Sequence, residues 1–401
     1  MNAATFAVVG LLFASAQITV GAAAEADLTK TYMTGPIPSE FKLGKLATID
    51  IPPDFEATAA VQTAVSEKIS QDPNAKKLGA QVSYRVGCNP AQSSFDYRYT
   101  GAVQPPKDQN PCGSCFIFAA TAAYEASWFL QNGSYVRVSE QEVLDCGNVG
   151  NCDSGGFHTR VFEFAKEKGF TRQDQYQNYH ASTGTCAVPA GPYTAINWNL
   201  VYKKSGIPNV KSIKESMCIH GPIVAAMYVT DEFAHYKSGV FNEKADLEGS
   251  SEVNHDILLV GWDDSKGAWL VKNSWGADWW GEKGFGWVDY STNNIGFGAA
   301  WIDAVRVQAA AAGNDTKVKQ AADESKKLDD QAVRELSKEV FKQNGDVKKL
   351  VEEIIAKQAK QAAEVINNSG QMVGGPNSFI NNPGQILGGP NSALNKLFRN
   401  F

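Results

Sequence analysis

The stretch Gln109-Asn110-Pro111-Cys112-Gly113-Ser114-Cys115-Phe116 decides the fold of this chain. Residues 117–128 follow it, are rich in alanine and contain neither glycine nor proline, and the pair Asn132-Gly133 comes next. This composition favours a helix, and an Asn-Gly pair is a typical helix stop. We therefore predict a helix that begins at Cys115. A thiol at that position lies near the positive end of the helix dipole, which favours the thiolate.

Two later segments supply the partners that a reactive thiol needs. They are Asn254-His255-Asp256 and Lys272-Asn273-Ser274-Trp275-Gly276. His255 stands before the strongly apolar residues 257–262, which predict a buried strand that holds its ring rigidly. A lone histidine in such a place is usually structural, but the thiol and Asn273 in the same chain favour a catalytic role.

Together these segments resemble the papain family of cysteine peptidases, in which His and Asn follow a Cys-Gly-Ser/Ala-Cys motif by about 130 to 150 residues. The resemblance covers residues 95–307 and implies an α+β fold with two lobes, a helical one carrying Cys115 and a β-rich one carrying His255 and Asn273. It implies peptide-bond hydrolysis through an acyl-enzyme on Cys115, with a thiolate and imidazolium ion pair at rest. It requires no cofactor and no metal.

The same resemblance assigns supporting roles around the thiol. Asn273 would accept a hydrogen bond from the second ring nitrogen of His255, and Trp275 would shield that contact from water. Gln109 would donate its side-chain amide to the oxyanion of the transition state, together with the backbone N–H of Cys115. Donors of this kind contribute about 3 to 4 kcal/mol.

Substrate binding is assigned from the family's positions as well. Gly155 and Gly156 would let an extended peptide pair closely with the backbone, although an ordinary turn is the alternative. Phe157 and Ala226 match positions of the main specificity pocket, and Val253 adds to it. The resemblance implies an apolar pocket that prefers Leu, Val or Phe at P2, the second residue before the cut.

The chain departs from the family pattern at several positions. Phe116 replaces the usual Trp, and Ser154 and the pair Trp279-Trp280 are apparent one-residue expansions. Asp256 replaces a small residue directly after the histidine. Its charge would raise the pKa of His255 if the carboxylate pointed into the cleft, and we expect it to point elsewhere.

The chain has seven cysteines. Because export is expected and an oxidising compartment favours disulfides, we expect most of them to be paired. The resemblance implies the bridges Cys112–Cys152 and Cys146–Cys186 and leaves Cys115 free. Two alternatives remain for the other pair: Cys88 and Cys218 form a third bridge, or Cys218 is a buried thiol and Cys88 lies in a removable segment. Zinc binding is disfavoured because no CxxC pair recurs with histidine at ligand spacing.

Composition excludes several protein classes. The chain has 401 residues, 43% of them hydrophobic and 20% charged, so it can bury a large core in two or three folded units. Its net charge is only −6 and no dense cluster of Lys and Arg is present. Neither nucleic acid nor an anionic membrane is therefore expected as the main partner.

The chain divides into five predicted segments. Residues 7–14 form an apolar run too short to span a bilayer, and Ala22-Ala23-Ala24 offers a cleavage site, so a signal peptide is predicted. A modest helix is expected at residues 55–69 of the segment that follows, which is a propeptide or a retained N-terminal arm. The ranges are a signal peptide at 1–24, a propeptide or arm at 25–93, a papain-like domain at 94–308, a helical extension at 309–367 and a repeat tail at 368–401.

Two features of the C-terminal region suggest regulation. Apolar residues at helical spacing predict two amphipathic helices separated at Asn344-Gly345, packed on the catalytic domain or on a partner. The tail repeats a Gly-Gln-x-x-Gly-Gly-Pro-Asn-Ser motif and is interpreted as a flexible segment. The sharper hypothesis is that residues 371–375, which resemble the hairpin of cystatins, occupy the active site.

The leading functional prediction is an exported cysteine endopeptidase that acts on proteins or peptides and is open to cystatin-type inhibitors. An endopeptidase is preferred because the interval from Cys152 to Cys186 has no room for a large cleft-blocking insertion. Its destination is the cell exterior, the periplasm or a lysosome-like or vacuole-like compartment. The alternatives are a non-hydrolytic binding or scaffold protein on the same fold and an acyl transfer to an amine.

Overall fold

The computed structural model describes residues 29–39, 46, 49, 51–52, 55–75, 86–187, 191–202, 206–307 and 315–342. The predicted signal peptide, the second predicted C-terminal helix and the repeat tail lie outside these ranges. Within them, no helix is long and apolar enough to cross a membrane.

The helices include the one predicted to begin at the thiol. Helix α3 starts at Cys115 and ends at Asn132, and Gly133 closes it with φ 65° and an N–H bond to the Phe129 carbonyl. The modest helix predicted at residues 55–69 is α1. The helices and their bounds are α1 Phe55–Gln71, α3 Cys115–Asn132, α4 Glu140–Cys146, α5 His158–Glu167, α6 Val210–His220, α7 Asp231–Ala234 and α8 Asp315–Lys342, with 3-10 turns at Tyr97–Thr100 and Gln173–Gln175.

The strands of the described residues form a nine-stranded mixed sheet and a small two-stranded one. In the large sheet the order is β1-β7-β10-β9-β8-β6-β11-β5, and β2 pairs with β8. The strands and their bounds are β1 Tyr32–Thr34, β2 Ser94–Asp96, β3 Gly150–Asn151, β4 Gly155–Gly156, β5 Ala195–Leu200, β6 Ile223–Met227, β7 Tyr236–Phe241, β8 His255–Asp263, β9 Ala268–Lys272, β10 Phe285–Asp289 and β11 Phe297–Ala304.

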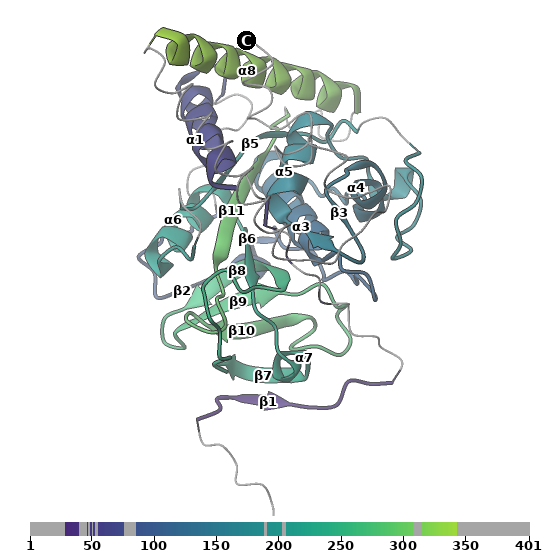
Figure 1. Ribbon diagram of the computed structural model, residues 1–401, viewed down its shortest axis with the longest axis vertical. Coiled ribbons are helices and arrows are strands. Elements are labelled where there is room, and N and C mark those ends of the chain that lie inside the picture. The colour runs from purple at the N-terminus through teal and green to yellow at the C-terminus, as the bar shows by residue number, and fades with distance from the viewer. Residues whose placement is uncertain are drawn as a thin grey trace, which may run out of the picture.

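The predicted α+β class and two-lobed arrangement are confirmed. Figure 1 shows α3, α4 and α5 gathered on one side of the molecule, and strands β7 to β10 forming a separate β-rich end. Helix α3 packs against β8 and β11, so it is buried along most of its length. This packing brings the first residue of α3 to the first residue of β8, where the two lobes meet.

The N-terminal segment contacts both lobes. Strand β1 adds to the edge of β7, and the ring of Tyr32 lies 4.7 Å from that of Phe241. At the other end of the segment, α1 lies on β5, where the buried amide of Gln62 donates to the Trp198 carbonyl at 2.7 Å. Figure 1 shows β1 and α1 at opposite ends of the molecule.

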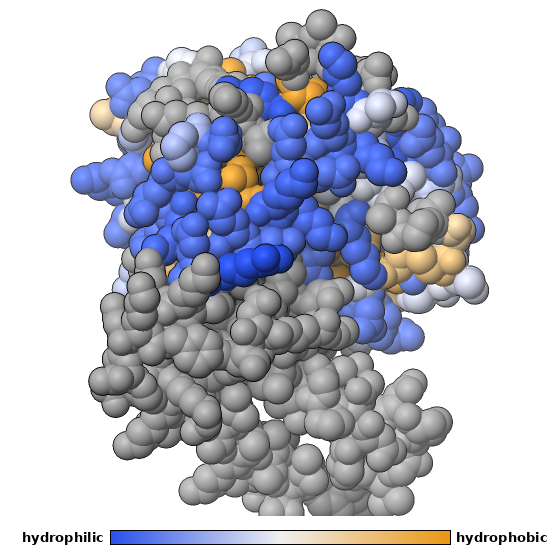
Figure 2. All heavy atoms as spheres, turned by 90° about the horizontal axis from the view of Figure 1, so that it is seen from above, coloured by the Kyte–Doolittle hydropathy of each residue, from blue (hydrophilic) through white to orange (hydrophobic). Residues whose placement is uncertain are grey.

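The C-terminal helix packs on this N-terminal helix. Of the predicted pair of helices, the structure describes the first, α8, which contacts α1 and β5 (Figure 1). Its buried residues recur every three or four positions and form one face. These residues are Val318, Ala321, Ala322, Ser325, Leu328 and Ala332. Figure 2 views the molecule from the α8 end and shows mostly hydrophilic residues among those described, as expected if the apolar face of α8 points inward.

Three disulfides stabilise the fold, and all seven cysteines lie in described segments. The structure has the bridges Cys112–Cys152 and Cys146–Cys186. Of the two alternatives for the remaining pair, it has the third bridge, Cys88–Cys218. Cys115 is the free thiol. The third bridge ties the segment before the predicted domain start to helix α6.

Candidate active site

Cys115 occupies the amino end of α3, as the sequence predicts. Its side chain is fully buried, and the nearby backbone N–H groups of Asp256, Phe116 and Cys115 itself favour the thiolate, although burial acts more strongly on its pKa. Ser114 precedes it, and the Ser114 hydroxyl lies 2.7 Å from the hydroxyl of Tyr179. The helix start therefore directs several backbone dipoles at the sulfur, an arrangement that favours negative charge there.

His255 begins β8 and directly precedes Asp256, which acts on the pKa of the thiol. Its Nε2 is 2.8 Å from Oδ1 of Asn273, and this oxygen also accepts the N–H of Ser274, so Nε2 carries the proton. The indole of Trp275 covers the pair, with ring centroids 5.0 Å apart. Nδ1 of His255 is buried and has no hydrogen-bond partner among the described residues. In this tautomer Nδ1 offers a lone pair, as a base for the thiol requires.

Protonation in this closed state differs from the predicted ion pair. Burial raises the pKa of Cys115 to about 12, and the charge of Asp256 adds to the rise, against backbone hydrogen bonds that lower it. Burial lowers the pKa of His255 to about 4, although the bond to Asn273 and the charge of Asp256 oppose this. At neutral pH both groups are therefore uncharged here. Burial thus opposes the ion pair in this state, and sequence spacing does not reveal this burial.

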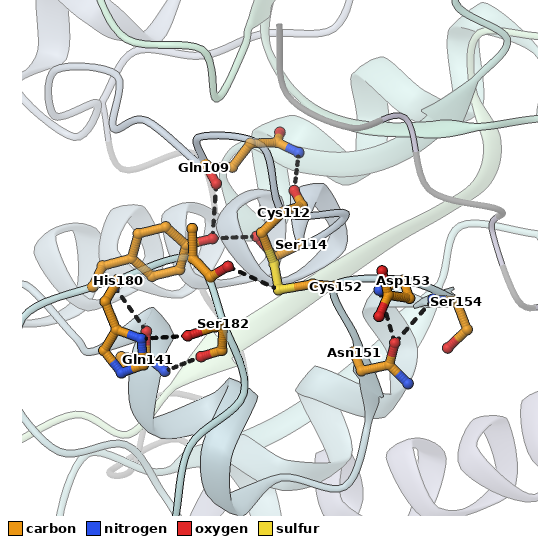
Figure 3. Close-up of a disulfide and its surroundings, with 12 residues drawn as sticks. Gln109, Cys112, Ser114, Gln141, Asn151, Cys152, Asp153, Ser154, His180 and Ser182 are labelled. Carbon is orange, nitrogen blue, oxygen red and sulfur yellow. Dashed lines mark hydrogen bonds between the residues drawn. A yellow bond between two sulfur atoms is a disulfide. The ribbon is translucent and has the colours of Figure 1, made fainter. Parts of the chain in front are cut away.

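Gln109 reaches the same site from the loop before α3. Its Nε2 donates to the Cys112 carbonyl at 2.9 Å, and its Oε1 accepts from the Ser274 hydroxyl at 2.6 Å. Figure 3 shows this loop joined through the Cys112–Cys152 disulfide to the turn that Asn151 forms. The bridge and the two amide contacts fix the side chain that was predicted to bind the oxyanion.

The predicted substrate-binding residues lie on both lobes. Gly155 and Gly156 form β4, and a Cβ on Gly156 would lie 2.6 Å from the ring of Phe116, so only glycine fits there. Phe157 follows directly and is fully buried. Ala226 of β6 is paired with Asp256 of β8.

The predicted pocket is in contact with the N-terminal segment. Val253 is partly buried in the loop before β8 and packs against the core. Phe55, the first residue of α1, makes an edge-to-face contact with Phe157 at 5.3 Å between ring centroids. An apolar side chain of the chain itself therefore lies against the predicted specificity pocket.

A buried cluster of charges lies behind the thiol. The ammonium of Lys107 is 2.8 Å from Glu125 and 2.6 Å from Glu140. Lys272 of β9 is buried nearby, and burial lowers its pKa to about 8. A cavity of about 10 Å³ between α3 and the sheet is lined by Lys107, Glu125, Lys272 and Asp256, among others. Lys107 thus joins α3 to α4, and the charge of Glu125 in α3 acts on Lys272 of β9 and raises its pKa against the effect of burial.

One contact at the site was not foreseen from the sequence. His158, the first residue of α5, lies with its Nδ1 3.1 Å from Oδ2 of Asp256, and both side chains are fully buried. We expected Asp256 to point away from the cleft, whereas its carboxylate is directed inward at His158. The available signal was the acid itself, because a buried carboxylate requires a partner, but no spacing rule connects positions 158 and 256.

Comparison with known proteins agrees with this geometry. A model of the papain family of cysteine proteases matches residues 91–303. Mouse pro-cathepsin H is 32% identical over 223 residues, a match of 54% of this chain and 66% of that protein. Pineapple fruit bromelain is 35% identical over 204 residues, with 50% and 55% covered.

A solved structure agrees as well. Digestive procathepsin L2 from the midgut of Tenebrio molitor larvae superposes with a TM-score of 0.52 at 25% identity, covering 68% of this chain and 84% of the other. The chain spans just under two thirds of the length of pro-cathepsin H and less of bromelain. The family match covers more than half of the chain and includes the thiol, the imidazole and the amide described above. The chain therefore belongs to the papain family of cysteine proteases.

Proposed function

We propose that the protein is an exported cysteine endopeptidase that cleaves proteins or peptides through an acyl-enzyme on Cys115. The observation that carries the proposal is the state of His255. Its Nε2 is held by Asn273, while its Nδ1 is buried without a described partner, and the next residue, Asp256, acts on the thiol at the start of α3. A fixed imidazole with a free lone pair beside a nucleophile is the arrangement that thiol catalysis needs.

The chemistry follows from these positions. Nδ1 of His255 takes the thiol proton, and the sulfur attacks the peptide carbonyl carbon. The carbonyl oxygen becomes an oxyanion, which the backbone N–H of Cys115 and the amide of Gln109 stabilise. The imidazolium returns its proton to the leaving amine as the carbon–nitrogen bond breaks. Water, deprotonated by His255, then hydrolyses the thioester and regenerates the thiol.

The preference proposed for an apolar P2 residue has support from the chain itself. Phe55 packs against Phe157 and is buried, so this region accepts an aromatic side chain. Ala226 leaves room because its side chain is small. We also propose that the enzyme cuts within chains and that cystatin-type inhibitors can enter the cleft once it is uncovered.

The first test is to map cut sites in an unfolded protein by mass spectrometry, with and without an irreversible thiol-directed inhibitor. We expect inhibitor-sensitive cuts away from the chain ends, with Leu, Val or Phe at P2 favoured over Gly by about a hundredfold, since a filled apolar pocket gives discrimination of this order. Cuts confined to terminal residues would contradict an endopeptidase. If both cleavage and labelling of the thiol are absent, even after removal of the residues before Phe95, a binding protein of the same fold is favoured instead.

Export is supported by the disulfides. Three bridges in one chain are typical of an oxidising compartment. We propose that residues 1–24 are a signal peptide, and that the destination is extracellular, periplasmic, or lysosome-like or vacuole-like. We also propose that residues 94–308 form the peptidase domain.

The N-terminal segment is proposed to restrain the enzyme. Cys115 and His255 are both fully buried. The segment holds the β-rich lobe through β1 and the other side of the site through Phe55. A substrate would need this space, so we propose that the segment blocks the cleft until it is displaced or cut.

The C-terminal extension is proposed to hold this cover in place. Helix α8 rests its apolar face on α1 and β5, which also contact each other. Displacing α1 would therefore expose apolar residues of α8 to water, which costs about 25 cal/mol per Å² of apolar surface. The extension thus makes release of the N-terminal segment less favourable.

Replacing Leu328 with Asp tests this restraint. Leu328 is 8% exposed, and a carboxylate in its place would be buried without a partner, which detaches α8. We expect hydrogen exchange of the full chain, followed by mass spectrometry, to rise about tenfold or more in α8 and also in α1.

The matched control is Gln320→Asp, which places the same charge on the exposed side of the same helix. It should leave exchange in both helices unchanged. Faster exchange in α8 alone would mean that α1 stays docked without it, and the proposed restraint would then be wrong.

A further inference from the structure

Asp256 and His158 connect the two lobes directly beneath the candidate active site. Asp256 is in β8 and follows His255, while His158 begins α5 in the helical lobe. Nδ1 of His158 lies 3.1 Å from Oδ2 of Asp256, and neither side chain is exposed. The charge of the same aspartate acts on the pKa of Cys115 and on that of His255. The carboxylate is therefore close to both reacting groups, where an unbalanced charge would act strongly.

The hydrogen-bond partners of His158 determine the charge of the pair. Its Nε2 is 2.8 Å from the carbonyl oxygen of Gly298, which can only accept, so Nε2 carries a proton. Its Nδ1 faces a carboxyl oxygen, so a second proton must lie between Nδ1 and Oδ2. Either an imidazolium faces a carboxylate, or a protonated carboxyl donates to a neutral ring. The net charge is zero in both cases.

The remaining charges around Asp256 come from the elements packed against it. Cys115 and Glu125 belong to α3, His255 precedes it in β8, and Lys272 of β9 and Lys107 line the same cavity as Asp256. The second carboxyl oxygen, Oδ1, is buried and has no hydrogen-bond partner among the described residues. His158 is thus the group that directly balances the acid.

We propose that His158 and Asp256 act as one neutral, proton-holding pair that positions the start of β8 against Cys115 and limits the effect of the Asp256 charge on His255. The two are positioning residues, since they act through the thiol and the imidazole. The pair explains how this chain places an acid where its family usually has a small residue. It also gives His158, which the peptidase mechanism does not use, a role at the site. The inference rests on the proposed function only in treating Cys115 and His255 as the reacting groups.

The test measures the titration of His255 by NMR in the full chain labelled with [13C]histidine, between about pH 3.5 and 8. The His255 signal is assigned by its loss in H255Q. We expect a midpoint near the value of about 4 that burial gives the wild type. In His158→Gln the carboxylate is left unbalanced, so the midpoint should rise by about one pH unit. Adding Asp256→Asn to that variant should return it to the wild-type position.

The single variant Asp256→Asn provides a second test, because the amide of Asn can donate a hydrogen bond to Nδ1 of a neutral His158. The titration midpoint of His255 in this variant should stay within about 0.3 pH unit of the wild-type value. This is well below the shift that an unbalanced neighbouring charge causes. An unchanged midpoint in His158→Gln, or a clear fall in Asp256→Asn, would show an unbalanced Asp256 and overturn the proposal. If His158→Gln does not fold, Asp256→Asn alone decides. The titration needs no turnover, so a failure of peptidase activity would appear separately, in the cut-site assay.

Discussion

Replacing Cys115 with Ala is expected to abolish cleavage, with a loss of about a millionfold in kcat, as found when a catalytic nucleophile is removed. The reason is that Cys115 is the free thiol of the chain, the other six cysteines being in disulfides. No other described sulfur can form the acyl-enzyme. The measurement is single-turnover cleavage of a fluorogenic peptide with an apolar P2 residue.

The control is to verify that the Cys115→Ala variant is folded. The three bridges should persist under non-reducing mass spectrometry, and the melting temperature should stay close to that of the wild type, because the substitution removes only one buried sulfur atom. Cys115→Ser should be equally inactive, since a hydroxyl is a far weaker nucleophile. Cleavage by Cys115→Ala that a thiol-directed inhibitor still blocks would come from a contaminant or from another group. It would remove the basis of the proposed mechanism.

Replacing Phe55 with Ala is expected to uncover the site and accelerate alkylation of Cys115 by iodoacetamide at pH 7 by about a hundredfold or more. Phe55 is 5% exposed and packs on Phe157. Truncating a buried Phe to Ala costs about 3 to 5 kcal/mol. If most of that cost weakens the docking of α1, the open population rises about tenfold for each 1.4 kcal/mol. Opening also hydrates the thiol, whose pKa burial holds at about 12, so more thiolate forms at pH 7.

The control is Glu67→Gln, an exposed position of the same helix, which should leave the alkylation rate unchanged. Circular dichroism should show that the β-rich and helical lobes remain folded in Phe55→Ala, so that faster labelling reflects local opening. If the rate does not change although hydrogen exchange shows that α1 has detached, another part of the chain must cover the thiol.

Much of the site was predictable because its parts are carried by short, contiguous motifs. The alanine-rich run after Cys115 has the propensity for a helix whatever its surroundings, and the apolar run after His255 can only be a buried strand or helix segment. Once these two elements are expected, the thiol and the imidazole are each placed at the start of one. The α+β fold then followed from the resemblance that these motifs carry.

Other features depended on contacts between distant residues, which no local pattern encodes. The bridge from Cys88 to Cys218 spans 130 positions, and sequence reasoning left it as one of two alternatives. The contact of His158 with Asp256 joins residues of two lobes. The packing of α8 on α1 joins the two ends of the described chain. An amphipathic pattern shows that a helix has an apolar face but does not show which surface receives it.

The sequence by itself therefore determined the family, the fold class and the thiol, imidazole and amide of the candidate site. Only the tertiary structure decided that these groups are covered, and hence that the thiol and imidazole are uncharged in this state. The physical reason is that a pKa depends on burial and on neighbouring charges, which are set by tertiary contacts such as that of Asp256 with His158. The identity of the reacting groups is local in the chain, whereas their protonation is a property of the whole fold.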